Sequence, residues 1–410
     1  MKGSNYAQIL RLTGALRFSL AGIFARAPMS IAGIGAILLL AQERDSYAVA
    51  GTASACYLLA AALIGPQVFR LIDAFGQRRV VPVLLAIHVP VFAAMVLVAV
   101  TTDLNWPIYL LALGAGASQP DAQTLVRARW AALLPRNPLL RTAFAWESVI
   151  DDIVLVVGPP LGALLAVRVS PVATLGLSMV LLVAGTLVMV ADRSTEPPPS
   201  GRRVVTKGRP AVLLPGVAQM CGVFGSVEVS TVALTASAGE PELSGTVLAL
   251  FAVGSLLAGV VFGAARMTAL PLAQFVAATV VFGAVFAGTA LVAVLATQQG
   301  IIGVVALVGI ALFLAGIARA PTLISGTSVI QGIVPPARLS ETLAWSMSAL
   351  SVGVAIATPL AGWVVDNDGA AAAYWVPAGC AVAATALALM SRVALRSASL
   401  KIQQPAPDPI

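Results

Sequence analysis

Apolar residues run along almost the whole chain in long stretches, broken by short clusters of polar residues, glycine or proline. A helix of about 20 apolar residues is long enough to cross the hydrocarbon core of a bilayer. The pattern therefore predicts twelve membrane-spanning helices, most of them joined by short loops. The predicted spans cover residues 14–41, 47–72, 80–101, 106–133, 140–167, 171–191, 211–237, 244–265, 270–296, 300–329, 340–364 and 371–391.

The composition agrees with this pattern. Of the 410 residues, 59% are hydrophobic and only 10% are charged, and the mean hydropathy is +0.96. Soluble domains carry roughly 25% charged residues, so a soluble enzyme, a nucleic-acid binder and a disordered chain are excluded. The single histidine and the three distant cysteines lack the spacing of a disulfide framework or metal site, and we expect no metal and no cofactor. No removable signal peptide is expected at the N-terminus.

One connection differs from the short loops. Residues 192–210 read DRSTEPPPSGRRVVTKGRP, with three successive prolines and five basic residues, which is typical of a solvated linker. This segment separates six predicted spans from six. We therefore predict an N-terminal six-helix bundle over 1–192, a linker over 193–210, a C-terminal six-helix bundle over 211–395 and a tail over 396–410.

Lysines and arginines gather on one side of the predicted topology. With the N-terminus in the cytoplasm, all but four of the 24 basic residues fall in cytoplasmic segments. The exceptions are Arg44 and Arg168 in outer loops and Arg26 and Arg319 within spans. Because cytoplasmic loops carry the excess of basic residues, we expect a multi-pass protein of a bacterial cytoplasmic (inner) membrane with both termini in the cytoplasm. The net charge of +7 then needs no nucleic-acid partner.

The two halves of the chain resemble each other at an offset of 199 or 200 residues. An even number of predicted spans separates the two copies, as in a repeat about an axis along the membrane normal. The predicted fold is an all-α membrane protein of twelve transmembrane helices, in two six-helix bundles related by a pseudo-two-fold axis. The matching pairs are Ala145-Trp146 with Ala344-Trp345, Pro160-Leu161 with Pro359-Leu360, Ala115-Gly116 with Ala315-Gly316, and Leu134-Pro135 with Val334-Pro335.

The loop after the second predicted span carries a motif, since residues 71–79 read LIDAFGQRR. This loop resembles the loop 2–3 signature of the major facilitator superfamily, G-x-L-A-D-R-x-G-R-K, with its leading glycine and two basic positions replaced. A glycine permits the tight turn, and charged groups can hold neighbouring helix ends. The resemblance implies that Asp73, Gly76 and Arg78 form a conformational latch that favours the outward-facing state. A loop that only marks the cytoplasmic side is the alternative.

The fifth predicted span contains a glycine- and proline-rich segment, GPPLG, at residues 158–162. It resembles the G-P-x-x-G core found in antiporters of the superfamily. Glycine lets helices approach closely, and proline frees a backbone carbonyl and bends the helix. We expect Gly158, Pro159, Pro160 and Gly162 to form a gate on a moving helix, and the resemblance favours export over import.

Seven ionisable side chains lie in the interior of predicted spans, away from their ends, all on helices that line or border the central cavity in the superfamily. A charge at the bilayer centre is costly unless water or a partner meets it, so this set is a candidate site for substrate or protons. Structural ion pairs are the alternative for any single member. The residues are Arg26, Asp121, Glu147, Asp151, Asp152, Glu228 and Arg319.

Glu147 and Asp151 are four residues apart and share a helix face, so we expect them to share a proton. Asp152 points about 100° away and is a candidate partner for an arginine. Asp121 follows a proline in mid-helix, where a kink would expose it. Family antiporters have an arginine early in the fourth helix, where this chain has Leu110, so coupling through that position is not expected.

Trp146 and Trp345 occupy equivalent places in the repeat. They are either interfacial anchors or aromatic walls of the substrate path.

Taken with the motifs, the chain is similar to the drug/proton antiporter group of the major facilitator superfamily. The resemblance implies a monomer that exports a lipophilic neutral or cationic small molecule in exchange for protons by alternating access. Its partners would be the substrate, protons and the lipid bilayer. An uptake symporter or uniporter for a small metabolite is the alternative. A membrane-embedded transferase is not expected, because the sequence offers no catalytic histidine/aspartate cluster and no sizeable soluble domain.

Overall fold

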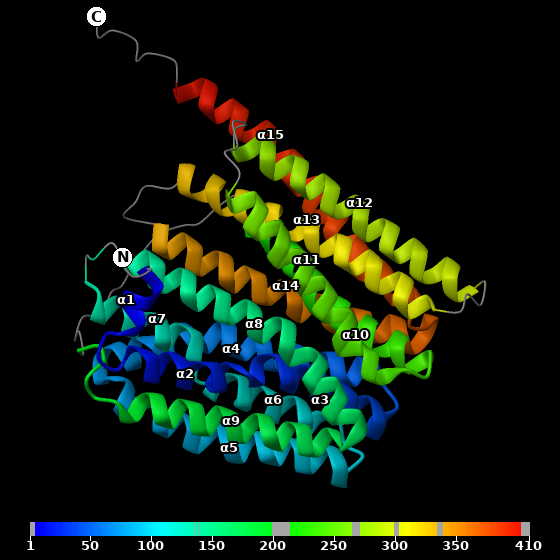
Figure 1. Ribbon diagram of the computed structural model, residues 1–410. Helices are drawn as coiled ribbons and strands as arrows, with labels where there is room; N and C mark the ends of the chain where they lie inside the picture. The colour runs from blue at the N-terminus through cyan, green and yellow to red at the C-terminus, as the bar shows by residue number, and fades with distance from the viewer. Residues whose placement is uncertain are drawn as a thin grey trace, which may run out of the picture.

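The computed structural model describes residues 5–135, 137, 139–198, 214–264, 271–298, 303–333 and 339–402, and within these ranges its regular structure is entirely helical. The first half of the chain forms one helical bundle (Figure 1). Its helices are α1 (Asn5–Leu10), α2 (Ala15–Arg26), α3 (Pro28–Arg44), α4 (Tyr47–Phe75), α5 (Gln77–Thr101), α6 (Trp106–Ser118), α7 (Ala122–Leu133), α8 (Leu139–Arg168) and α9 (Pro171–Ala191).

The second half forms the second bundle. Residues 199–210 of the predicted linker lie outside the described residues. The helices of this bundle are α10 (Leu214–Ser237), η1 (Pro241–Leu243), α11 (Ser244–Ala264), α12 (Pro271–Gln298), α13 (Val304–Ile333), α14 (Leu339–Asp368), η3 (Ala372–Tyr374) and α15 (Trp375–Ile402).

Nine helical segments of the described chain are long and apolar enough to cross a membrane, and the first of them joins α2 and α3 into one pass. The α6–α7 pair, α10 and α14 run beside them and complete twelve passes, as the hydrophobic pattern predicts. Two predicted spans are interrupted. Pro28 begins α3 after a turn at Ala27, and the segment around Pro120 separates α6 from α7. A proline lies at each break, and proline removes a helical hydrogen bond.

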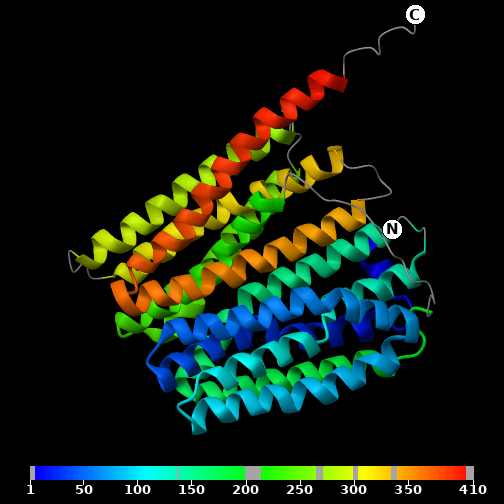
Figure 2. The same ribbon diagram turned by 180° about the vertical axis from the view of Figure 1, so that it is seen from behind.

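Successive helices run in alternate directions between two faces. The face where α2 begins and α15 ends is called the terminal face below. The other, where α3 ends and α4 begins, is called the opposite face. The bundles meet along two seams, α8 against α11 and α4 against α14. Figure 2 shows α14 lying along α4. The repeat makes α8 equivalent to α14 and α4 equivalent to α11. A pseudo-two-fold axis therefore exchanges the two seams.

Candidate functional site

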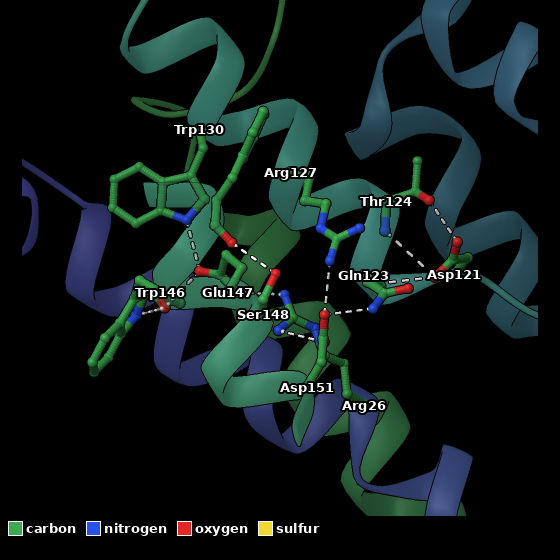
Figure 3. Close-up of polar contacts among 12 residues, drawn as sticks. Arg26, Asp121, Gln123, Thr124, Arg127, Trp130, Trp146, Glu147, Ser148 and Asp151 are labelled. Atoms are coloured by element: carbon green, nitrogen blue, oxygen red, sulfur yellow. Dashed lines mark hydrogen bonds and ion pairs between the residues drawn. The ribbon is translucent and has the colours of Figure 1, made fainter. Parts of the chain in front are cut away.

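A cluster of charged side chains lies inside the first bundle, where α2, α7 and α8 meet (Figure 3). It is called the Arg26 cluster here and comprises Arg26, Arg127, Glu147 and Asp151. Arg26 is the last residue of α2, just before the turn that precedes Pro28, and its side chain is 3% exposed. The guanidinium of Arg26 therefore enters the helix interface at a break in the first membrane pass.

Glu147 is the most enclosed member of the cluster, with no exposed surface. Its carboxylate accepts a hydrogen bond of 2.6 Å from Nη2 of Arg26 and another of 2.6 Å from Nε1 of Trp130. A third bond of 2.9 Å comes from the hydroxyl of Ser19. These three donors give both carboxylate oxygens of Glu147 a hydrogen-bond partner.

Asp151 is one turn further along α8 and is 19% exposed. Its carboxylate lies 3.1 Å from Nη1 of Arg26 in an ion pair without hydrogen-bond alignment. Nη2 of Arg127 donates to it at 2.9 Å, and the side-chain amide of Gln123 donates at 2.5 Å. Asp151 thus joins a buried arginine on α2 to a half-exposed arginine on α7.

The cluster is electrically balanced when both carboxylates are ionised. Arg127 is one of the basic residues that the charge distribution assigns to the cytoplasmic side. The structure places it on α7, where it pairs with Asp151. Two arginines therefore face two acids, and Arg26 contacts both carboxylates. A buried ion pair needs such compensation, because the cost of desolvation is high.

Two tryptophans border the cluster. The indole N–H of Trp146 donates to the Ser19 hydroxyl at 3.0 Å, so Trp146 supports a ligand of Glu147. Trp130, which the sequence analysis does not single out, is fully buried against Phe18. No motif or spacing in the sequence marks Trp130 or Ser19 as partners of Glu147. The side chain of Trp345 lies outside the described residues.

Asp121 is not part of this cluster. It is the N-cap of α7 and accepts hydrogen bonds from the backbone N–H groups of Gln123 and Thr124 and from the Thr124 hydroxyl. Its carboxylate is exposed where the chain resumes helical structure after Pro120. Asp121 therefore fixes the start of the helix that carries Gln123 and Arg127.

A second polar group lies on the second bundle, around Arg319 of α13. Nη1 of Arg319 donates to the Ser255 hydroxyl at 3.3 Å. Its guanidinium carbon is 5.9 Å from the ring centre of Phe224 and 5.8 Å from that of Phe251. Arg319 also interacts electrostatically with Asp152, which belongs to the first bundle. This group, called the Arg319 site, brings together charged residues of both bundles.

Glu228 lies one turn from Phe224 on α10, at the contact with the first bundle. A Cβ atom placed on Gly33 of α3 would lie 2.7 Å from Oε1 of Glu228, so the carboxylate packs directly on the backbone of α3. Asp152 and Glu228 thus supply two carboxylates between the bundles, against the single charge of Arg319. The sequence predicts these three residues as inward-facing, but it gives no sign of the two phenylalanines under Arg319.

The predicted latch residues lie at the terminal face. Gly76 has φ 88° in the turn between α4 and α5, a conformation that glycine adopts readily. The backbone N–H of Arg78 donates to Glu196 at 3.0 Å. Asp73 lies in the last turn of α4.

Gln77, which replaces a basic residue of the family motif, connects this turn to α7. It accepts a hydrogen bond of 2.8 Å from the fully buried Arg129, which also donates to Thr195 at 2.7 Å. Hydrogen bonding from Ser194 lowers the pKa of Asp192 below its usual value. The first residues after α9 are therefore held against the terminal face of the first bundle.

The predicted gate segment of α8 lies where α8 contacts two other helices. Gly158 packs on Ser30 and Gly162 on the backbone of Ile31, both in α3. On the other side, Pro159 and Pro160 meet the backbone of Gly245, the second residue of α11. The helix α8 continues through both prolines.

A matching contact closes the other seam. A Cβ atom on Gly51 of α4 would lie 2.6 Å from the carbonyl oxygen of Thr358 and 3.0 Å from Cα of Pro359, both in α14. At Gly245 a Cβ would collide with the carbonyl of Pro159. Both glycines lie near the opposite-face ends of their helices. The bundles are therefore in backbone contact at these two points near the opposite face, where a residue larger than glycine does not fit.

Comparison with known proteins identifies the fold. No family model and no curated protein sequence matches the chain. The structure is similar to a bacterial homologue of the iron transporter ferroportin in its inward-facing state, with a TM-score of 0.71, 15% identity and coverage of 92% of this chain and 97% of that chain. The outward-facing state of such a homologue gives a TM-score of 0.60, with 14% identity and coverage of 92% and 98%.

A variant of the nucleoside transporter NupG gives a TM-score of 0.72, with 12% identity and coverage of 92% of this chain and 98% of that chain. At these identities the likeness extends to the fold alone. The chain has a two-bundle membrane fold of the major facilitator type.

Proposed function

We propose that this chain is a secondary transporter that exports a lipophilic neutral or cationic small molecule in exchange for protons by alternating access. The two-bundle fold and the similarity to solved transporters support transport as the general activity. The basic residues of the terminal face support its placement in a bacterial cytoplasmic membrane with that face inside. We propose a monomer as the working unit.

The charge arrangement between the bundles is the observation that carries the proposal. The Arg26 cluster has two acids for two arginines, whereas the groups between the bundles are two carboxyl groups, Asp152 and Glu228, and one arginine, Arg319. The rings of Phe224 and Phe251 lie beside the guanidinium of Arg319. Two carboxyl groups with a single arginine favour an organic cation or a proton as a further partner, because either one compensates the surplus acid.

Within the Arg26 cluster we propose different roles for the two acids. Glu147 accepts hydrogen bonds from three donors and has no exposed surface, so it anchors Arg26 in every step of the transport cycle. Asp151 is partly exposed and is bound to the half-exposed Arg127. Protonation of Asp151 would release Arg127 and free one side of Arg26, which couples a proton to the position of α2 relative to α7.

The test uses purified protein in proteoliposomes with an acidic lumen that contains a pH-sensitive dye. Tetraphenylphosphonium, a lipophilic cation, is added outside. Antiport predicts luminal alkalinisation that depends on the protein and disappears with Asp152→Asn combined with Glu228→Gln. Cation flux without proton movement would instead indicate a uniporter, and co-directional movement of the two would indicate a symporter. Either result would overturn proton-driven export.

A further inference from the structure

The end of α14 is joined to the start of α4 across the seam between the bundles at the opposite face. Oδ2 of Asp366 accepts a hydrogen bond of 2.7 Å from the Ser46 hydroxyl. The backbone N–H groups of Tyr47 and Ala48 donate to the same carboxylate at 2.8 and 2.9 Å. Asp366 belongs to the second bundle and its three donors to the first, so these bonds exist only while the bundles are closed at this face.

The chemistry of this contact favours a carboxylate. The first N–H groups of a helix have no partner within the helix, and the helix dipole places partial positive charge there. Ser46 is the N-cap of α4, and its hydroxyl accepts from the N–H of Val49 at 3.3 Å. Asp366 therefore completes the cap of a helix in the other bundle, with charge-assisted bonds to two of its free N–H groups.

Among the described residues, the polar contact at the other seam is of a different kind. Its polar link is an ion pair of 2.8 Å between Arg168 and Glu242, whose side chains are 66% and 34% exposed. Exposed ion pairs of this kind contribute little, because two long side chains must be ordered to form them. Asp366 is also exposed, but its carboxylate bonds directly to backbone N–H groups. The packed backbone around Gly51 and Gly245 sets how closely the helices approach, but those contacts include no charged group.

We propose that Asp366 is a gating residue that holds the opposite face of the protein closed by capping α4. Opening at that face separates α14 from α4 and exposes the carboxylate and the free N–H groups of α4 to water. The open state loses the three bonds, while the closed state keeps them. Asp366 thereby favours the state that is closed at the opposite face over the state that is open there. It belongs to neither the Arg26 cluster nor the Arg319 site.

The test measures the distance between spin labels on the two bundles at the opposite face. Labels replace Leu104, between α5 and α6, and Leu295, near the end of α12, in a chain whose three cysteines are replaced by serine. Both leucines are exposed and lie away from the contact. Asp366→Ala removes all three acceptor contacts, and Asp366→Asn removes the charge while keeping the shape. Asp368→Asn is the matched control, since Asp368 ends the same helix with the same charge and is likewise exposed.

Asp366→Ala is expected to raise the ratio of long to short label distances about tenfold, which corresponds to about 1.4 kcal/mol, and Asp366→Asn to raise it in the same direction. The control should match the unsubstituted chain. Identical distance distributions in all four proteins would overturn the proposal. The measurement needs neither substrate nor a proton gradient, so its outcome is separate from the proposed transport activity. Size-exclusion profiles establish that each variant is folded.

Discussion

Replacing Glu147 by glutamine tests whether the Arg26 cluster is held together by a charged anchor. The substitution keeps the size of the side chain and removes its negative charge. The fully buried carboxylate binds Arg26 at 2.6 Å, Trp130 at 2.6 Å and Ser19 at 2.9 Å. A glutamine oxygen can still accept from some of these donors, but its amide N–H₂ group would face donors in place of an acceptor.

The expected loss of stability follows from what remains for Arg26. Removing one partner of a buried ion pair costs about 3–5 kcal/mol, because it leaves an uncompensated charge. Arg26 keeps Asp151 at 3.1 Å, although that contact is not aligned as a hydrogen bond. We therefore expect Glu147→Gln to lower the free energy of unfolding by about 3 kcal/mol, at the lower end of that range.

Unfolding of the detergent-solubilised protein by sodium dodecyl sulfate, followed by tryptophan fluorescence, measures this change. Asp152→Asn is the matched control. It removes the same charge from the same helix five residues away, but Asp152 makes no ion pair with Arg26. Its effect should be below about 1 kcal/mol. Equal stabilities of the Glu147 and Asp152 variants would refute the anchoring role of Glu147.

Three further predictions address the transport cycle. Asp151→Asn should reduce proton-driven transport by at least about tenfold while substrate exchange at equal pH continues, because the proton-accepting group is lost; wild-type pH dependence would contradict it. Gly245→Leu should shift the protein away from the state closed at the opposite face, since the leucine side chain would collide with the Pro159 carbonyl; unchanged labelling of a cysteine introduced at the opposite-face end of the α8–α11 seam would count against this. Asp73→Asn should slow turnover without changing substrate Kd, and a changed Kd would argue against a role limited to the latch.

Much of the fold follows from the sequence because burial in a bilayer depends on runs of apolar residues. The runs predict the number of passes, and prolines at positions 28 and 120 coincide with the two interrupted passes. The helices α13, α14 and α15 end beyond the predicted limits, since helices extend past the hydrocarbon core into polar segments. Hydropathy contains no information about where such a helix ends.

The site was only partly predictable. Glu147 and Asp151 share a face of α8, as their spacing requires, yet their partners come from α2 and α7. Arg127 is a basic residue near the end of a predicted helix, so a rule based on charge alone assigns it to the cytoplasmic face. Trp130 and Phe251 are uncharged aromatic residues and cannot be told from core residues until the folded chain places a charge beside them.

The sequence by itself determined that this protein lies in a lipid bilayer, how many helical passes it makes and that its two halves repeat. Those properties arise from transfer free energies that add along the chain and from local backbone chemistry. Only the tertiary structure decided which charges meet, that Arg26 stands between two acids, and that Asp366 caps a helix of the other bundle. Such pairings depend on distances of a few ångströms between helices far apart in sequence, and electrostatic and hydrogen-bond energies change sharply over that range.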